Sequence, residues 1–284
     1  MLDFLTDRQW LWLAALFYLA VFGVGTFRVL RGRHHGTALT YVLMLIGYAL
    51  QLSGLYLRGE AVGGCPLGNK FEIFQFTAWS ATTLYLVVGV TFRSSMLGYF
   101  TACLTAVLSL VSLALPSWDA TRSANLFGGN PWIEFHAALA LFSYGVFALL
   151  ALTSILFLLR NYSLKSKRVG GWFSFLPSIL SLEQIGVRLL GTGVALLSAS
   201  LLVGASWWLR DTSSADSGKI IVTVSVWAAY AVVLLLRLTR RLLSRRFSWT
   251  CLILFVLALL SLGPVNSSRH TPAAGETARR ETLP

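Results

Sequence analysis

The chain has 284 residues, of which 56% are hydrophobic and only 12% are charged, and its mean hydropathy is +0.71. A soluble domain is usually about one-quarter charged, so this composition excludes an ordinary soluble protein. The net charge is +12, but the basic residues gather in particular loops, which is typical of membrane orientation and not of nucleic-acid binding.

Eight apolar stretches follow one another along the chain, each of roughly the length that crosses a bilayer core of about 30 Å as a helix. They lie at 9–29, 38–57, 71–92, 96–115, 132–159, 189–209, 220–237 and 249–264. The sequence therefore predicts an all-α polytopic membrane helix bundle of about eight transmembrane helices over residues 1–264. Residues 265–284 are predicted to be a polar, disordered C-terminal tail.

The loops between these stretches alternate in charge. Fourteen of the 23 Lys and Arg residues fall in the loops after the first, third, fifth and seventh spans, whereas ten of the eleven acidic residues fall on the other side. The exception is Glu183. Because cytoplasmic loops are enriched in Lys and Arg, this pattern predicts that both termini lie outside. In the cytoplasmic loop before the sixth span, Ser181 with Gln184 resembles a capping box, which predicts that this helix begins inside the cytoplasm.

The fifth span carries an ionisable residue, His136, in its second turn. Such a residue in a membrane helix is by default a functional hypothesis. The topology places His136 near the outer surface, and His270 at a similar depth after the last span. Two neutral imidazoles on different helices are the axial ligands that a haem iron needs. The alternative is that His136 is an interfacial residue bonded to a loop and that His270 belongs to a loose tail.

Other outer residues have simpler interpretations. Tryptophans at the outer interface, Trp10, Trp12, Trp118, Trp132, Trp207 and Trp208, fit an aromatic belt. For the adjacent Trp207 and Trp208, the alternative is a platform on which a porphyrin lies. Glu72 and Glu134 are interpreted as solvated residues at helix ends and not as an acid/base pair. Cys65 is interpreted as a free cysteine.

The common catalytic signatures are absent from the sequence, which has no Walker A motif, no G-x-S-x-G and no H-E-x-x-H. The three cysteines form no C-x-x-C, no haem-attachment motif and no zinc spacing. The sequence thus predicts a protein that is not an enzyme.

Three stretches together resemble the integral membrane cytochrome c assembly proteins of the CcsA/HemX type. They are PLGNKFE at 66–72 running to Trp79, the H-x-x-x-x-x-x-S-Y helix within 132–144, and RLLG at 188–191 leading to GASW at 204–207. Trp227 and Tyr230 fit the span that follows. The resemblance covers about residues 10–270 and is closest to the HemX-like inner-membrane branch.

The resemblance implies haem handling on the outer face of a bacterial inner membrane during cytochrome c maturation. In the family, two outer histidines flank a Trp-rich loop that holds haem. His136 matches the first histidine, and His270 falls where the second is expected. The implied cofactor is haem. The implied partners are the lipid bilayer, haem and other cytochrome c assembly or haem-biosynthesis membrane proteins, without nucleic acid.

Departures from the family pattern concern the full haem-transporting members. Those members carry W-G-x-x-W-x-W-D-x-x-E between spans six and seven. Residues 207–219 lack the repeated Trp-x-Trp and keep only Asp216 near the expected acid. A further intramembrane histidine of those members would fall near Leu235. These differences favour an accessory or regulatory protein of the HemX kind.

Two alternatives to haem handling stay open. The first is a cofactor-free membrane interaction or regulatory protein that stabilises a haem-pathway enzyme or assembly complex. The second is a small-solute transporter. It fits least well, because transporters usually place polar groups or broken helices at the bilayer midplane, and the midplanes here hold mostly Ser, Thr and Gly.

Overall fold

The computed structural model describes residues 5–31, 37–92, 95–120, 130–167, 176–209 and 217–267. These residues form eight long α-helices and one short 3-10 helix, without any β-strand among them. The elements are α1 (Asp7–Leu30), α2 (Thr37–Val62), α3 (Lys70–Phe92), α4 (Ser95–Ala114), η1 (Pro116–Asp119), α5 (Pro131–Lys165), α6 (Ile179–Trp208), α7 (Ser217–Leu238) and α8 (Ser244–Ser267). The predicted all-α helix bundle is confirmed.

Seven of the eight long helices are long and apolar enough to cross a membrane, so the chain is a multi-pass membrane protein. Within the described residues, α3 falls outside this set because its first two turns carry Lys70, Glu72 and Gln75. Gln75 of α3 is fully buried and bonds Ser112 of α4 and Gln51 of α2. Such groups are tolerated in a membrane helix when neighbouring helices satisfy them. The polarity of α3 therefore reflects its place inside the bundle.

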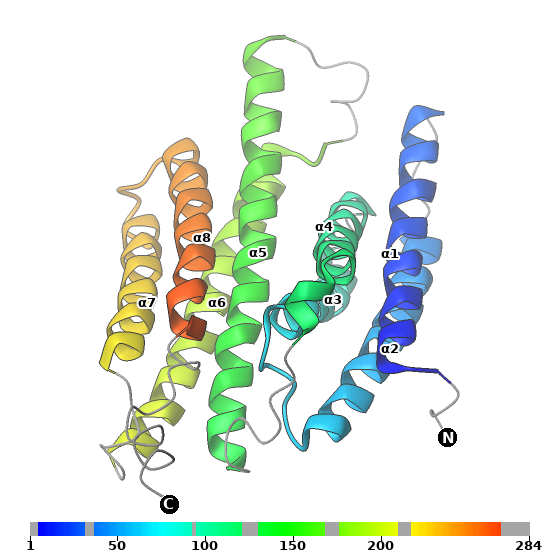
Figure 1. Cartoon of the computed structure of the whole chain (residues 1–284). Coiled ribbons are helices and arrows are strands. Elements are labelled where there is room, and N and C mark those ends of the chain that lie inside the picture. The colour runs from blue at the N-terminus through cyan, green and yellow to red at the C-terminus, as the bar shows by residue number, and fades with distance from the viewer. Residues whose placement is uncertain are drawn as a thin grey trace, which may run out of the picture.

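The long helix α5 lies at the centre, with α1 to α4 on one side and α6 to α8 on the other (Figure 1). It packs tightly against α3 at Gly145. A Cβ atom added at Gly145 would lie 3.0 Å from the carbonyl oxygen of Thr77 and would collide with the hydroxyl of Ser80. The absence of a side chain at this position thus lets the two halves of the bundle meet almost backbone to backbone.

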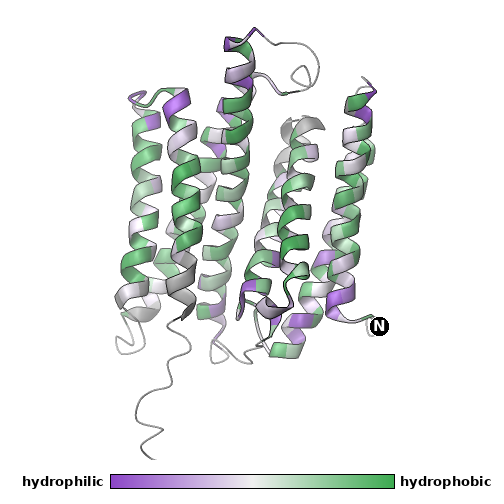
Figure 2. Cartoon of the chain, turned by 45° about the horizontal axis from the view of Figure 1, so that its top comes forward, coloured by the Kyte–Doolittle hydropathy of each residue, from purple (hydrophilic) through white to green (hydrophobic). Residues whose placement is uncertain are grey.

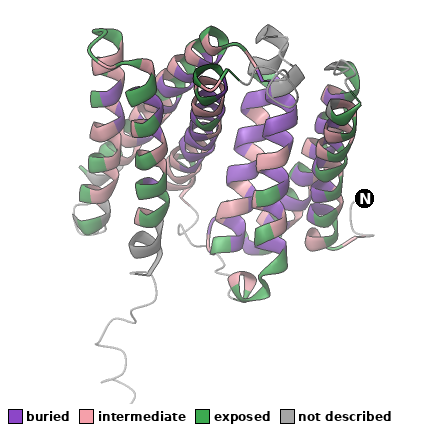
Figure 3. Cartoon of the chain, turned by 90° about the horizontal axis from the view of Figure 1, so that it is seen from above, coloured by how far each residue is buried: buried purple, intermediate pink, exposed green. Residues whose placement is uncertain are grey.

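The surface of the bundle fits a lipid environment. Hydrophobic residues run along the helices and hydrophilic ones gather near their ends (Figure 2). In the view from above, α7 and α8 expose much of their outer faces, whereas α3 is largely buried (Figure 3). Large apolar side chains such as Ile221, Leu235 and Leu260 are more than half exposed. Lipid is the surrounding that makes such exposure favourable.

Helix ends differ from the predicted spans mainly at the end of the bundle that is predicted to face the cytoplasm. Helix α6 begins at Ile179, ten residues before the predicted span, as expected for a helix that starts inside the cytoplasm. The predicted capping box is wrong, because Ser181 lies within α6 and its N–H donates to Ser178 Oγ at 3.1 Å. Ser178 therefore caps the helix, three residues before the predicted position.

Helix α1 begins and α8 ends at the same end of the bundle (Figure 1), as an even number of spans requires. The assignment of this end to the outside stays a prediction from the loop charges, and this end is called the outer end below. The domain boundary after residue 264 is also still a prediction. Helix α8 continues to Ser267, and the tail from 268 onward, with His270, lies outside the described residues.

Candidate functional site

His136 lies in the second turn of α5, whose start is well defined by its sequence. Asn130 accepts a hydrogen bond from the N–H of Trp132 at 3.0 Å, and Pro131 occupies the first helical position. Both residues are typical of a helix N-terminus. The half-buried imidazole faces α6, where its Nδ1 lies 2.7 Å from the carbonyl oxygen of Ser200.

Contacts with Ser200 determine the tautomer of His136. A backbone carbonyl only accepts hydrogen bonds, so Nδ1 must carry a proton and donate it to the Ser200 oxygen. In the neutral ring, Nε2 then holds the free lone pair. The Ser200 hydroxyl donates to the backbone carbonyl of His136 at 2.9 Å and lies 3.0 Å from Nδ1. This is the outer-shell arrangement that fixes a histidine as an Nε2 metal ligand in proteins.

Gly204, one turn beyond Ser200 on α6, provides the space for the imidazole ring. A Cβ atom at position 204 would lie 2.7 Å from Cε1 and 2.8 Å from Nδ1 of His136. The absence of a side chain at position 204 therefore lets the ring contact α6 this closely. Trp227 of α7 donates from its indole N–H to Ser198 Oγ at 2.8 Å, which ties the next helix to this part of α6.

The other predicted haem residues cannot be placed beside His136. His270 lies outside the described residues. Trp207 and Trp208 belong to the last turn of α6, but their side chains are also outside the described part of the chain. Ser143 bonds the carbonyl of Ala140 in its own helix at 2.6 Å. Among the described residues, no group of three His, Cys, Asp or Glu side chains is arranged to hold a metal ion.

Glu134 holds the loop between α2 and α3 against α5, so it is not the solvated residue that the sequence predicted. Its Oε2 accepts a hydrogen bond from the backbone N–H of Cys65 at 3.3 Å. Gly64 is so close that an added Cβ would lie 2.6 Å from Oε1. The pKa of the Cys65 thiol is raised to about 11. Burial is the largest cause, followed by the negative charges of Glu134 and Glu72. Cys65 is thus an unreactive thiol near neutral pH.

Glu72 is also not solvated, because it belongs to a buried ion cluster centred on Arg58. The Arg58 side chain is fully buried, and its Nε donates to Glu72 Oε1 at 2.7 Å. Glu72 Oε2 accepts from the N–H of Gly68 at 2.6 Å, and Asn69 caps the first turn of α3 by accepting from the N–H of Glu72. The sequence predicted correctly that Glu72 lies at a helix end, but it did not predict the ion pair with Arg58.

The cluster extends to α1 and η1. Arg58 Nη1 donates to Asp7 Oδ2 at 2.9 Å, and Nη2 pairs with Asp119. Arg8 reaches Asp119 from the rim at 3.2 Å. A planar guanidinium can donate in three directions at once, so one side chain joins α1, α2, α3 and η1. The sequence signal was Arg58 near the end of a span, together with acids at the same predicted depth.

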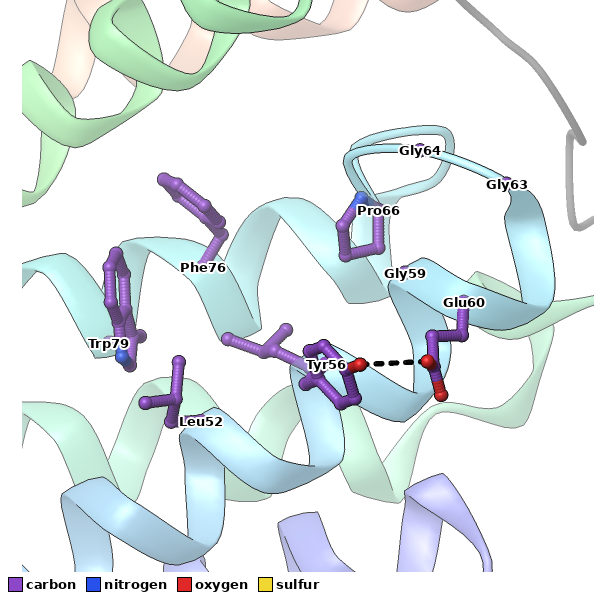
Figure 4. Close-up of a pocket in the computed structure, with 10 residues that line it drawn as sticks. Leu52, Tyr56, Gly59, Glu60, Gly63, Gly64, Pro66, Phe76 and Trp79 are labelled. Atoms are coloured by element: carbon purple, nitrogen blue, oxygen red, sulfur yellow. Dashed lines mark hydrogen bonds between the residues drawn. The ribbon is translucent and has the colours of Figure 1, made fainter. Parts of the chain in front are cut away.

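An apolar groove lies between α2 and α3 at the outer end. It has a volume of about 470 Å³ and is lined by Leu52, Leu55, Tyr56, Gly59, Glu60, Gly63, Gly64, Pro66, Phe76 and Trp79 (Figure 4). Tyr56 donates to Glu60 Oε1 at 2.8 Å on its rim. Trp79 stacks on Tyr48 with ring centroids 5.8 Å apart.

The groove and His136 are on different sides of α5. Glu134 touches the loop that walls the groove, while His136 contacts α6. Residues two apart on an α-helix point about 200° apart, so the two side chains diverge. The groove therefore does not extend the His136 site.

The fold and the outer-end residues define a polytopic helical membrane protein with one conformationally fixed histidine near the predicted outer surface. Residues 67–271 match the family described as Cytochrome C assembly protein. The match spans most of the chain, so the chain belongs to this family, and the resemblance inferred from the three motifs is confirmed.

The chain is similar to proteins named HemX and CcsA. The chain is 28% identical over 236 residues to Protein HemX of Brevibacillus brevis, which covers 82% of this chain and 86% of that protein. It is 24% identical over 263 residues to Protein HemX of Bacillus subtilis, covering 89% and 91%. Identity to the cytochrome c biogenesis protein CcsA of Chlamydomonas reinhardtii is 28% over 211 residues, covering 72% and 58%.

Proposed function

We propose that this membrane protein of the cytochrome c assembly family handles haem at the outer face of a bacterial inner membrane, with His136 as an axial ligand. One observation carries the proposal. The Ser200 carbonyl holds Nδ1 of His136 as a donor and leaves Nε2 with its lone pair. The nitrogen that carries the lone pair is the one that binds a metal ion.

The residues around His136 fit a haem iron in their chemistry. When bound, haem supplies an iron that takes neutral imidazole nitrogen as an axial ligand. Ser200 orients the imidazole, and Gly204 leaves room for it against α6. His270 is proposed as the second ligand, and Trp207 and Trp208 as the aromatic surface against the macrocycle. The names of the relatives, which include cytochrome c biogenesis proteins, support the same role.

The test is a haem titration of the purified protein in detergent. The wild type should give a shifted Soret band, and His136→Ala should lose it. A matched control is His34→Ala/His35→Ala, which removes two histidines from the predicted cytoplasmic loop and should leave the band unchanged. If the wild type takes up no haem, or if His136→Ala keeps the wild-type spectrum, the proposal is wrong.

Sidedness is tested separately by cysteine labelling from either face of the membrane. A cysteine engineered beside His136, at Trp132, should react with an impermeant reagent added outside intact cells. Labelling only after the cells are opened would place the site in the cytoplasm and would rule out haem handling at the outer face.

A second candidate function is a cofactor-free interaction protein that stabilises a haem-pathway enzyme or assembly complex. The contacts of Ser200 with both the ring and the backbone of His136 favour it, because they clamp α5 to α6 without any cofactor. In that case His136→Ala would lower the thermal stability of a haem-free protein, and a partner would co-purify with the wild type in the absence of haem.

A further inference from the structure

The connection between α7 and α8 lies at the end of the bundle opposite the start of α5 (Figure 1). It carries a cluster of four arginines. Arg240, Arg241, Arg245 and Arg246 are all exposed. They fall within seven consecutive residues that also include the start of α8. Four positive charges so close together repel one another, and an anionic partner would relieve this repulsion.

The turn that presents these arginines is ordered by its own hydrogen bonds. The N–H of Arg241 donates to the carbonyl of Leu236 at 2.9 Å, and Arg240 adopts a left-handed backbone with φ 57°. Arg237 braces the turn by donating to the carbonyl of Leu242 at 2.8 Å and by pairing with Glu183 of α6. These contacts fix the backbone of the turn from which the arginine side chains project.

No carboxylate of the described residues pairs with the four exposed arginines. Glu183 is the one acidic residue that the loop charges place on this side of the membrane, and it already pairs with Arg237. Within the described part of the chain, none of the four forms an ion pair. A bound anion would supply the counter-charge that the described residues do not.

The start of α8 is a second feature that favours a bound anion. Arg245 and Arg246 stand in the first turn of a 24-residue helix, where the helix dipole is positive and basic side chains are unfavourable. Leu243 precedes the helix and has no side-chain acceptor for the first backbone N–H groups. An anion at this position would offset the charge of the arginines and accept hydrogen bonds from the first N–H groups of α8, which have no partner within the helix.

Apolar side chains beside the cluster indicate that the anion is attached to a hydrocarbon chain. Trp249 and Ile253 follow Arg245 at one-turn intervals on the same face of α8 and are 49% and 53% exposed. Leu238 and Leu243 flank the turn and are 65% and 69% exposed. A free phosphate would not contact these apolar side chains, whereas the acyl chains of a phospholipid would cover them.

We propose that the α7–α8 hairpin is a binding site for an anionic phospholipid. Arg245, Arg246 and the backbone N–H groups at the start of α8 hold the phosphate, and the acyl chain lies along Trp249 and Ile253. Arg240 and Arg241 contact the rest of the charged headgroup. This site is independent of haem handling at the outer end.

The experiment measures lipid binding to delipidated protein in a neutral detergent by native mass spectrometry. Phosphatidylglycerol is titrated, with phosphatidylcholine and soluble glycerol phosphate as comparison ligands. The test variants are Arg245→Gln/Arg246→Gln and Trp249→Ala. The control is Lys165→Gln/Lys167→Gln, which removes the same charge from exposed residues at the end of α5, on the same predicted side.

Phosphatidylglycerol should bind at least tenfold more tightly than phosphatidylcholine. Since a basic residue beside an anionic lipid contributes about fivefold, the double arginine variant should bind it roughly 25-fold more weakly. Trp249→Ala should weaken phosphatidylglycerol binding without affecting glycerol phosphate, and the lysine control should change it less than threefold. An equal loss in the lysine control would show unspecific charge attraction. Glycerol phosphate binding as tightly as the lipid would show a phosphate site only. Either result would overturn the proposal.

Discussion

Replacing Arg58 with alanine should strongly destabilise the outer end of the bundle. The Arg58 side chain is fully buried, and Glu72 and Asp119 beside it are only 2% and 5% exposed. Without the guanidinium, both carboxylates would remain in a nearly dry environment without their main counter-charge. Breaking a buried ion pair from one side typically costs about 3–5 kcal/mol.

The assay is thermal unfolding in detergent at a fixed scan rate. For a chain of this size, 1 kcal/mol corresponds to a shift of about 2–4 °C in Tm, so Arg58→Ala should lower Tm by roughly 6–20 °C. Arg58→Lys should fall in between, because one ammonium cannot donate to Glu72, Asp7 and Asp119 in their present geometry.

Arg8→Ala is the matched control, since Arg8 also pairs with Asp119 but its side chain is 31% exposed. An exposed pair contributes about 0–1 kcal/mol, so this variant should lower Tm by no more than a few degrees. Equal Tm values for Arg58→Ala and Arg8→Ala would refute the reasoning that burial makes the Arg58 cluster essential. A second check is Arg58→Met/Glu72→Gln, which should recover part of the lost stability because the two residues are coupled.

Three further predictions concern the rest of the bundle. Gly145→Ala should cost about 1–3 kcal/mol by overpacking α5 against α3, seen as a lower Tm that adding Ser80→Ala only partly restores, because the Thr77 carbonyl is still in the way. Gly204→Ala should displace the His136 ring and weaken haem binding roughly tenfold in the Soret titration, with little change in Tm. The alkylation rate of Cys65 should keep rising with pH toward its pKa of about 11 and not level off near 9. Glu134→Gln should move that midpoint down, and an unchanged midpoint would contradict the assigned cause.

The helices were predictable because hydrophobic length is a strong signal in a membrane protein. All eight predicted spans correspond to observed helices, and α3 (Lys70–Phe92) was found from its length even though it is not among the seven helices that are apolar enough to cross a membrane. The start of α6 was predicted less well. Ser178 and Ser181 are both plausible caps in sequence, and only the folded helix shows which hydroxyl accepts the N–H.

The surroundings of the site were less predictable than its central residue. His136 was visible because a titratable group in an apolar helix is unusual. Ser200 was not, because a serine in a membrane helix normally bonds to its own backbone, and the tertiary pairing of α5 with α6 decides otherwise. Glu72 and Glu134 were misjudged for a related reason, since sequence places a carboxylate at a helix end but does not show what folds over it.

The length of α5 has a mechanical consequence. Its 35 residues make a rod of about 50 Å, which exceeds the hydrocarbon thickness by several turns. A continuous rod that reaches water on both faces cannot tilt at one end without swinging at the other. A ligand that tilts α5 at His136 would therefore also displace Lys165 at the opposite end of the same helix.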